Sequence, residues 1–253
     1  MIALSVNLNK IALIRNSRDT RNPGIPQHAQ MCIDAGANGI TVHPRPDQRH
    51  IRAADCFDLS EMLSVEFNIE GNPFTEGRRS DRSDVGDYPG FMALVKAIRP
   101  AQCTLVPDGD SQLTSDHGFD LTHDGDKVAL LVAELKSLGI RTSLFMDPDP
   151  LQIKLAAQTG ADRIELYTET YARACLENKS VDAVFNQFVV AAETAIDEGL
   201  GINAGHDLDL NNLPLFSTLP GLQEVSIGHA LVVDAIRIGL DNTIQAYQRA
   251  LGK

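Results

Sequence analysis

Apolar residues recur along this chain in short continuous runs, separated by longer segments with helical spacing. The runs are rich in β-branched and aliphatic residues, which is typical of strands covered on both faces in a parallel sheet. Eight such strands are expected, at residues 2–8, 39–43, 65–70, 102–107, 140–146, 162–168, 201–205 and 222–230. Amphipathic segments between and after them predict helices at 26–37, 53–63, 91–100, 126–139, 150–160, 181–200 and 230–251.

The order of these elements predicts the fold. Repeated strand-then-helix units imply parallel strands with right-handed crossovers, and eight is the number that closes a barrel. A doubly wound open sheet is the alternative, but neither a GxGxxG pattern nor a P-loop follows the first strand. No linker divides the chain, so we expect an α/β protein with one domain, residues 1–253, a (β/α)8 TIM barrel with extra helices.

Three long polar segments interrupt this pattern. Residues 9–26 are interpreted as a loop that carries Arg15, Arg18 and Arg21. Residues 71–90 are rich in Gly, Pro, Ser, Asp and Arg, which predicts a mobile loop on the rim. Residues 108–126 form a further long loop, and such loops inside a compact domain are often lids.

Composition and charge exclude several classes of protein. The chain has 34 acidic and 22 basic residues among 253, and its net charge of -12 disfavours nucleic acid and anionic membranes as partners. Four scattered cysteines form neither a CxxC pair nor a metal-binding spacing. The first fifteen residues do not have the pattern expected of a signal peptide, and no apolar run approaches the roughly 18 residues of a membrane span. These features predict a reduced, cytoplasmic protein.

The barrel prediction locates the functional site, because barrel enzymes carry their chemistry where the carboxyl ends of all eight strands meet. The residues at those ends, and just after them, are mostly polar or charged. They are Asn7, Asn9, Lys10, His43, Arg45, His50, Glu70, Asp108, Thr114, Asp147, Glu165, Tyr167, Asn203, His206, Gly228 and His229.

Four cationic or titratable residues lie at the end of the second expected strand and in the loop after it: His43, Arg45, Arg49 and His50. Arginine offers a fork of donors, and histidine changes charge near neutral pH, so this loop can receive a phosphate. A solvated basic loop is the alternative interpretation. The position of the loop at the barrel mouth favours phosphate binding.

Two Gly-His pairs, Gly205-His206 and Gly228-His229, lie at the ends of the seventh and eighth expected strands. Glycine lets backbone amides approach a ligand, and a helix starting just beyond points further amides at an anion. A phosphate site between units seven and eight recurs in this fold. The alternative is a turn glycine followed by a capping histidine.

Glu70 and Glu165 are expected to point inward near the barrel mouth. Buried carboxylates are costly unless paired, and they commonly act as acids, bases or groups that stabilise a cation. The alternative is a structural salt bridge with Lys10 or Arg45.

Several segments together resemble the pyridoxine 5'-phosphate synthase (PdxJ) family over nearly the whole chain. They are VNLNKIALIRNSR, GITVHPRPDQRHI, EFNIEGNP, TLVPD followed by QLTSDHGFD, SLFMDPD, INAGHDL and EVSIGHA. The resemblance implies a (β/α)8 barrel with extra helices, assembled as a homo-octamer, with no metal or organic cofactor. It also implies condensation of 1-deoxy-D-xylulose 5-phosphate with 3-amino-2-oxopropyl phosphate to pyridoxine 5'-phosphate, phosphate and water.

The resemblance further implies roles for individual residues. His43 and Glu70 would accept protons, His206 would donate one, and Glu165 would stabilise a cationic intermediate. The residues that would hold the amino-ketone phosphate are Asn7, Arg18, Asp207, Gly228 and His229. Those that would hold the deoxyxylulose phosphate are Asn9, Lys10, Arg45, His50 and Thr114, the last on the loop that matches a lid.

Three features depart from the familiar form of the family. Asn9-Lys10 stands where many members have Asp-His, Asp207 stands where many have Gly, and the 71–90 insert is larger than usual. Lys10 keeps a cation for a phosphate. Asp207 could offer its backbone amide as Gly would, with its carboxylate turned away from the ligand.

Two other functions remain open at this point. A different phosphosugar enzyme on the same barrel, an isomerase or an aldolase, would need fewer proton-transfer groups, and a Schiff-base aldolase would need a lysine inside the barrel. A non-catalytic binder of phosphorylated metabolites would keep the pocket without the chemistry.

Overall fold

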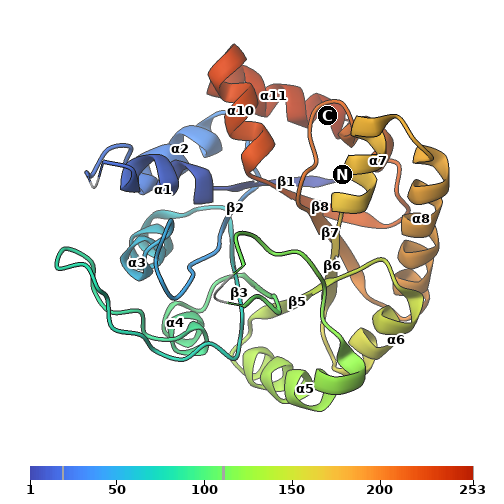
Figure 1. Ribbon diagram of the computed structural model, residues 1–253, viewed down its shortest axis with the longest axis horizontal. Coiled ribbons are helices and arrows are strands. Elements are labelled where there is room, and N and C mark those ends of the chain that lie inside the picture. The colour runs from blue at the N-terminus through green and yellow to red at the C-terminus, as the bar shows by residue number, and fades with distance from the viewer. Residues whose placement is uncertain (19, 110–111, 253) are drawn as a thin grey trace.

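Eight parallel strands close into a barrel in the order β1 to β8 (Figure 1). The computed structural model describes residues 1–18, 20–109 and 112–252. The strands are β1 Ala3–Asn7, β2 Gly39–Val42, β3 Glu66–Gly71, β4 Gln102–Leu105, β5 Arg141–Met146, β6 Arg163–Tyr167, β7 Gly201–Gly205 and β8 Leu222–Ile227. The expected (β/α)8 TIM barrel is therefore confirmed.

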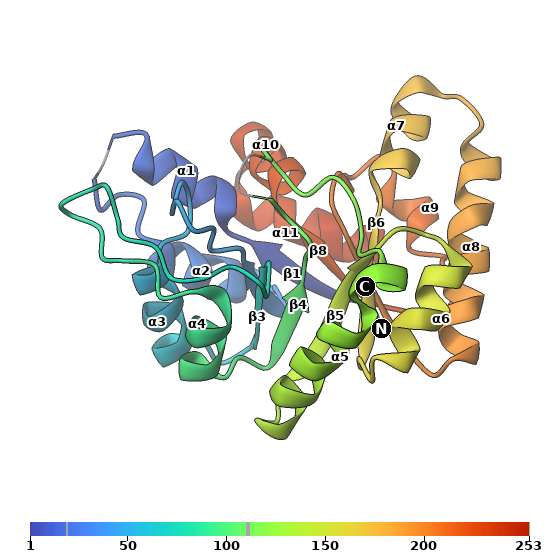
Figure 2. The ribbon, with the colours of Figure 1, turned by 60° about the horizontal axis from the view of Figure 1, so that its bottom comes forward.

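Helices surround the barrel and supply the outer layer of the core (Figures 1 and 2). They are α1 Asn9–Asn16, α2 Ile25–Asp34, α3 Ala53–Met62, α4 Phe91–Ile98, α5 Leu121–Ser137, α6 Pro150–Gln158, α7 Glu169–Glu177, α8 Val181–Asp197, α9 Leu213–Phe216, α10 His229–Ile238 and α11 Leu240–Ala250. Among the residues described, no helix has the length and apolar character that a membrane crossing requires.

The two faces of the buried strands differ in chemistry. In β2, Ile40 and Val42 are fully buried in the apolar core, whereas the Thr41 hydroxyl lies 2.7 Å from the Ser5 hydroxyl of β1. Asn68 of β3 and Thr104 of β4 are also buried and hydrogen-bonded to each other at 3.1 Å. The interior of the barrel is therefore lined in part by polar side chains that satisfy one another.

The structure corrects three expectations for the helices. Residues 9–26 are not all loop, because they contain α1, whose Ile11 and Ala12 are buried. Helix α5 begins at Leu121 rather than 126, since the Asp120 carboxylate accepts the Thr122 amide and caps the helix five residues earlier. The expected helix at 230–251 is divided at Gly239, whose φ of 82° no continuous helix allows.

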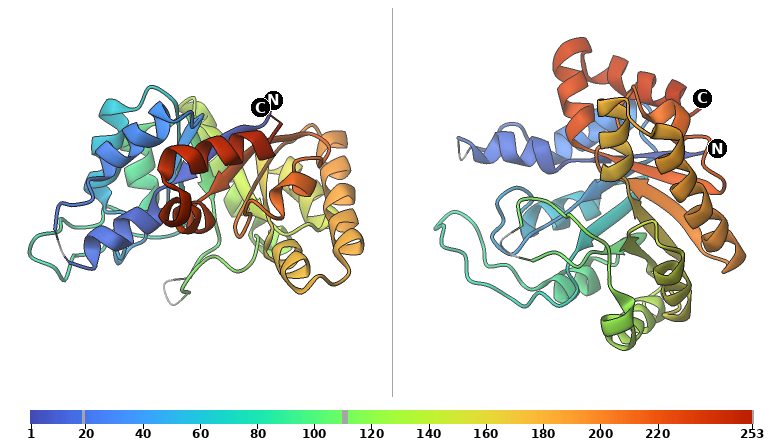
Figure 3. Two further views of the ribbon diagram at one scale, coloured as in Figure 1. Left: turned by 90° about the horizontal axis from the view of Figure 1, so that it is seen from above. Right: turned by 45° about the vertical axis from the view of Figure 1, so that its right-hand side comes forward.

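Helices α10 and α11 close the ring against the start of the chain. Figure 3 shows them beside α1 and α2, and the Gln248 side chain donates to the Asn38 amide oxygen at 3.3 Å. The junction between β8 and β1 places two phosphate-site candidates, Asn7 and Gly228, next to each other.

The 71–90 insert reaches outward from the rim beyond α3 and α4 (Figure 2). An antiparallel bridge joins Arg78 to Tyr88, and the buried Tyr88 hydroxyl donates to the Pro44 carbonyl at 3.3 Å. The polar composition of the insert predicts a surface loop, but the structure shows that part of it is buried. It packs on the loop that follows β2 and so supports His43 and Arg45.

Candidate active site

The proton-transfer candidates lie at the carboxyl ends of the strands. His43 directly follows β2, Glu70 is near the end of β3, Glu165 lies in β6 and His206 directly follows β7. The first three are buried, and the His206 side chain is only 22% exposed. The barrel therefore brings together residues that are far apart in the sequence.

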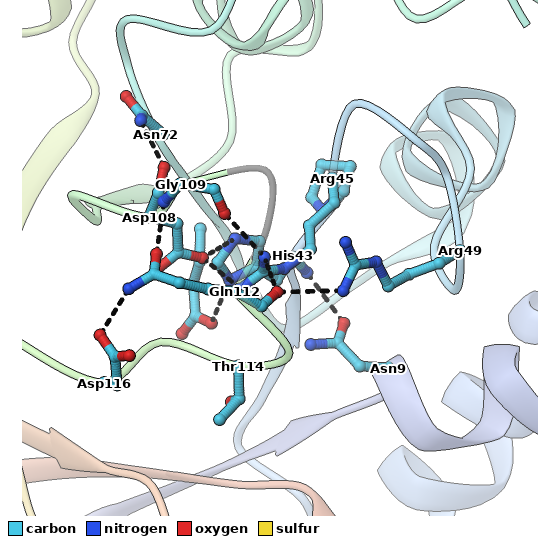
Figure 4. Close-up of polar contacts among 12 residues, drawn as sticks. Asn9, His43, Arg45, Arg49, Asn72, Asp108, Gly109, Gln112, Thr114 and Asp116 are labelled. Atoms are coloured by element: carbon cyan, nitrogen blue, oxygen red, sulfur yellow. Dashed lines mark hydrogen bonds and ion pairs between the residues drawn. The ribbon is translucent and has the colours of Figure 1, made fainter.

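His43 stands between two carboxylates. Its Nδ1 lies 3.8 Å from Glu70 Oε2, and its Nε2 lies 3.1 Å from Asp108 Oδ2, in the loop after β4. The backbone N–H of His43 donates to Asn9 Oδ1 at 2.9 Å, which anchors the start of the loop (Figure 4). Main chain and ring are both held, so the imidazole has a defined orientation.

The two carboxylates next to His43 differ in proton affinity. Burial, reinforced by the charges of Glu165, Asp108 and Glu224, raises the pKa of Glu70 well above its usual range. Burial also opposes ionisation of Asp108, but contacts with His43, Arg45 and Ser115 outweigh it and lower the pKa of Asp108 to about 2. Glu70 therefore has a higher proton affinity than Asp108, which is ionised at neutral pH.

A chain of side chains inside the barrel connects the two glutamates. Asn68 donates to Glu70 Oε1 at 3.4 Å, and Thr104, which donates to Asn68 at 3.1 Å, lies 3.4 Å from Glu165 Oε2. Burial, reinforced by Glu224, raises the pKa of Glu165 to about 8. Within the described part of the chain, neither glutamate forms the salt bridge with Lys10 or Arg45 that is the alternative interpretation.

Glu165 depends on a glycine in the next strand. A Cβ at Gly205 would lie 2.6 Å from Glu165 Oε1 and 3.1 Å from the Ser226 carbonyl. Gly205 was singled out as a residue for ligand approach, but in the structure it makes room for the catalytic candidate Glu165.

The guanidinium of Arg45 is occupied by the loop that follows β4. It contacts Asp108 Oδ2 at 2.6 Å and donates to the carbonyl of Gln112 at 2.9 Å, and Arg49 donates to the same carbonyl at 3.0 Å (Figure 4). A small hollow lies beside these groups, lined among others by His43, Arg45, Arg49 and Asp108. The basic cluster is therefore hydrogen-bonded, with His43, Arg45 and His50 buried and Arg49 partly exposed, and it is not a solvated loop.

His50 is buried at the base of this cluster, with its ring 6.4 Å from that of His43. Burial, together with the charges of His43, Arg45, Arg49 and Lys10, lowers the pKa of His50 well below its usual range. Its Nδ1 accepts the Ile51 amide at 2.9 Å, which leaves Nε2 as the protonated donor nitrogen.

On the opposite side of the mouth, His206 contacts the lid candidate. Its Nε2 lies 2.9 Å from the Thr114 hydroxyl, and its Nδ1 lies 2.8 Å from Asp207 Oδ2. The hydrogen bond from His206 is the largest contribution that lowers the pKa of Asp207. His206 and Asp207 both have positive φ, 83° and 55°, a strained conformation that is often found at functional sites.

The remaining candidates surround the seam between units one and eight. Asn7 donates to Glu70 at 3.5 Å and accepts the Asn9 amide at 3.0 Å, and Lys10 follows on α1. Gly228 caps α10, His229 is its first residue, and a Cβ at Gly228 would lie 3.1 Å from that of Asn7. The N-terminus of α10 thus presents its backbone amides next to Asn7, which agrees with the expectation from the second Gly-His pair.

Arg18 is the candidate that the structure leaves apart from the others. It lies in the turn after α1 with an exposed side chain, and none of its described contacts joins it to the barrel mouth.

The expected lid, residues 108–126, includes positions 110 and 111, which are outside the described residues. Its described part contacts Arg45, Arg49 and His206.

Sequence reasoning gave no role to Asp108, Asn68 or Thr104. Asp108 was recognised at the end of a strand, and its position after Val106-Pro107 resembles that of His43 after β2. Asn68 and Thr104 lie inside strands that were expected to be buried, and the sequence does not show that their side chains contact the two glutamates. Among the residues described, no three His, Cys, Asp or Glu side chains cluster in a way that could hold a metal ion.

A closed (β/α)8 barrel with histidines and glutamates gathered at its carboxyl mouth defines this chain as a barrel enzyme. Residues 4–253 match the profile of the family described as pyridoxal phosphate biosynthesis protein PdxJ, and the chain belongs to that family. The resemblance seen in the motifs is thereby confirmed.

Curated relatives agree with this assignment. Pyridoxine 5'-phosphate synthase from Xanthomonas axonopodis pv. citri (strain 306) is 54% identical over 248 residues, which cover 96% of this chain and 94% of the relative. The protein of the same name from Xylella fastidiosa (strain 9a5c) is 51% identical over 248 residues, 96% of this chain and 92% of the relative.

Solved structures support the fold alone. The 3-hexulose-6-phosphate synthase from Salmonella typhimurium superposes with a TM-score of 0.61 at 13% identity and covers 99% of this chain and 98% of its own. The tryptophan synthase A-subunit from Pyrococcus furiosus gives a TM-score of 0.59 at 13% identity, covering 100% of this chain and 98% of its own.

Proposed function

We propose that this chain is a pyridoxine 5'-phosphate synthase. It condenses 1-deoxy-D-xylulose 5-phosphate with 3-amino-2-oxopropyl phosphate to give pyridoxine 5'-phosphate, phosphate and water. Relatives more than half identical to this chain carry that name. The observation that carries the proposal most directly is the placement of His43 within 3.8 Å of Glu70, beside a basic cluster at the barrel mouth.

The reaction needs protons to move at several fixed places. An amine adds to a ketone and loses water to form an imine, protons leave carbon, and phosphate departs before the ring becomes aromatic. A positioned acid or base contributes about 100- to 10,000-fold to each such step. His43 and Glu70 serve as the proton acceptors, and His206 on the opposite side serves as the donor.

Glu165 stabilises the cationic intermediate. Its carboxylate lies inside the barrel, fully buried, and is connected to Glu70 through Thr104 and Asn68. A protonated imine nearby favours the ionised form of Glu165, although burial favours the neutral one. The charge of the intermediate and that of Glu165 then compensate each other in a site with little water.

Two groups of residues bind the phosphates. Arg45, His50, Asn9, Lys10 and Thr114 hold the deoxyxylulose phosphate, with His50 neutral and donating through Nε2. The residues that hold the amino-ketone phosphate are Asn7, Asp207, Gly228 and His229, and Arg18 would have to reach them from its exposed turn after α1. Asp207 contributes its backbone amide, since its carboxylate is turned to His206.

The other two functions are less well supported. A Schiff-base aldolase would need a lysine inside the barrel, and none of the eight strands contains one. A non-catalytic binder would not need His43, Glu70, His206 and Glu165 all turned to one mouth.

We further propose three properties, which the resemblance to the family supports. The chain folds as one domain over residues 1–253, acts in the cytoplasm and assembles as a homo-octamer. Light scattering of the purified protein is expected to give eight times the chain mass of 27.5 kDa. A particle of one or two chains would contradict the octamer.

The function is tested by adding both phosphate substrates to chelator-treated protein. Pyridoxine 5'-phosphate and inorganic phosphate are expected to appear in equal amounts, without added metal. If each substrate binds but neither product appears, the synthase assignment is wrong for this chain.

A further inference from the structure

We propose that Asp108 is a positioning residue that fixes His43 in the tautomer with the proton on Nε2, so that Nδ1 faces Glu70 as the basic atom. For its effect on turnover this inference rests on the proposed function. The tautomer itself belongs to the protein without substrate and can be tested separately.

The geometry places Asp108 in this role. Its Oδ2 lies 3.1 Å from His43 Nε2 and 2.6 Å from Arg45, and the residue is only 7% exposed. The carbonyl of Asp108 accepts a hydrogen bond from Asn72 at 2.6 Å, which holds the main chain (Figure 4). A buried carboxylate held at both ends can fix the orientation of a ring next to it.

The negative charge of Asp108 determines which nitrogen of His43 carries the proton. Because the pKa of Asp108 is lowered to about 2, its carboxylate can only accept hydrogen bonds at neutral pH. The imidazole nitrogen that faces it must therefore carry the proton. In the neutral ring this leaves a lone pair on Nδ1, directed toward Glu70 at 3.8 Å.

Glu70 completes the arrangement. Burial and neighbouring carboxylates raise its pKa, so Glu70 binds a proton more tightly than Asp108 does. The other charged or titratable groups around the ring are Arg45 and His50 from its own loop, with Arg49 and Lys10 next to His50. Glu70 Oε2 lies 3.8 Å from Nδ1, beyond hydrogen-bond distance, on the side of His43 that faces away from Asp108.

A different role for Asp108 makes a different prediction. Asp108 could merely occupy Arg45 until a substrate phosphate replaces it. In that case its removal would free Arg45, lower the KM for deoxyxylulose phosphate and leave kcat unchanged. If Asp108 positions His43, its removal lowers kcat and does not lower KM.

Neutron diffraction of deuterium-exchanged crystals of the wild-type protein, at slightly alkaline pD and without substrate, tests the tautomer. Deuterium is expected on His43 Nε2, with Nδ1 bare. Deuterium on Nδ1, alone or together with Nε2, would overturn the proposal. This outcome does not depend on any enzymatic activity or on the folding of a variant.

Kinetics of Asp108→Asn test the effect on turnover, with Asp197→Asn as a matched control at an exposed position at the end of α8, outside the site and the expected lid. Asp108→Asn is expected to lower kcat about 100-fold, the lower end for acid–base catalysis, without lowering either KM. The control should keep wild-type kcat. A lower KM with unchanged kcat would refute the positioning role. Absence of synthase activity in the wild type would refute the proposed function and leave the neutron test valid.

Discussion

At the scale of single residues, the site consists of histidines held by neighbouring carboxylates. His43 has Asp108 and Glu70 on its two sides, and His206 has Asp207. The histidines and glutamates were recognisable from sequence because they follow apolar strands. Asp108 was not assigned a role, because the sequence does not show that the loop after β4 folds back onto the loop after β2.

Glu165→Gln tests the buried carboxylate through the pH dependence of stability. The folded-state pKa of Glu165 is about 8, above the ordinary value of 4.5, so the folded state binds more protons between these pH values. The contribution of Glu165 to folding stability is therefore largest below pH 4.5. This contribution decreases as the pH rises toward about 8, by an amount on the order of a few kcal/mol.

The glutamine variant should lose this contribution. Urea unfolding from pH 5 to pH 8 is expected to show a smaller loss of stability in Glu165→Gln than in the wild type. Parallel pH curves for the two proteins would show that Glu165 does not titrate in this range.

Asp207→Asn tests whether the carboxylate serves His206 or the phosphate. Asparagine tolerates the positive φ of 55° at this position, so the backbone amide should stay in place. Because Asp207 Oδ2 contacts His206 Nδ1 at 2.8 Å, kcat is expected to fall about tenfold, with little change in KM for the amino ketone. A raised KM with normal kcat would instead assign the carboxylate to substrate binding.

At the scale of elements, the sequence predicted the strands better than the helices. All eight strands were found, because a continuous apolar run has few other interpretations in a repeated βα pattern. Helix α1 was missed because Asn9, Lys10 and Asn16 make its sequence look polar, although Ile11 and Ala12 pack on the core. The division at Gly239 was missed because the apolar spacing continues on both sides of the glycine.

Gly205→Ala tests the contact between β7 and β6. The added methyl group would lie 2.6 Å from Glu165 Oε1, so Glu165 must move. The variant is expected to lose at least tenfold in kcat, since even small displacements of catalytic groups are costly. Gly86→Ala is the matched control, because nothing lies within 4 Å of its added Cβ. Normal kcat in Gly205→Ala would show that the position of Glu165 is not critical.

At the scale of the whole molecule, an acidic protein builds a local cationic site. The net charge is -12, yet Arg45 and Arg49 gather with the neutral His50 at one mouth of the barrel, where the ring closure also brings α10 next to Asn7. The barrel architecture and the location of the site were predictable from the alternation of elements. The polar contacts inside the barrel were not, since they depend on the register between strands.

The central claim is that His43 and Glu70 form the proton-transfer pair of a pyridoxine 5'-phosphate synthase. The most direct test is the rate of pyridoxine 5'-phosphate formation by Glu70→Gln, compared with the wild type and with Glu61→Gln, an exposed position on α3. Glu70→Gln is expected to bind both substrates and to lose at least about 100-fold in turnover, while Glu61→Gln keeps the wild-type rate. Unchanged turnover in Glu70→Gln would contradict the claim.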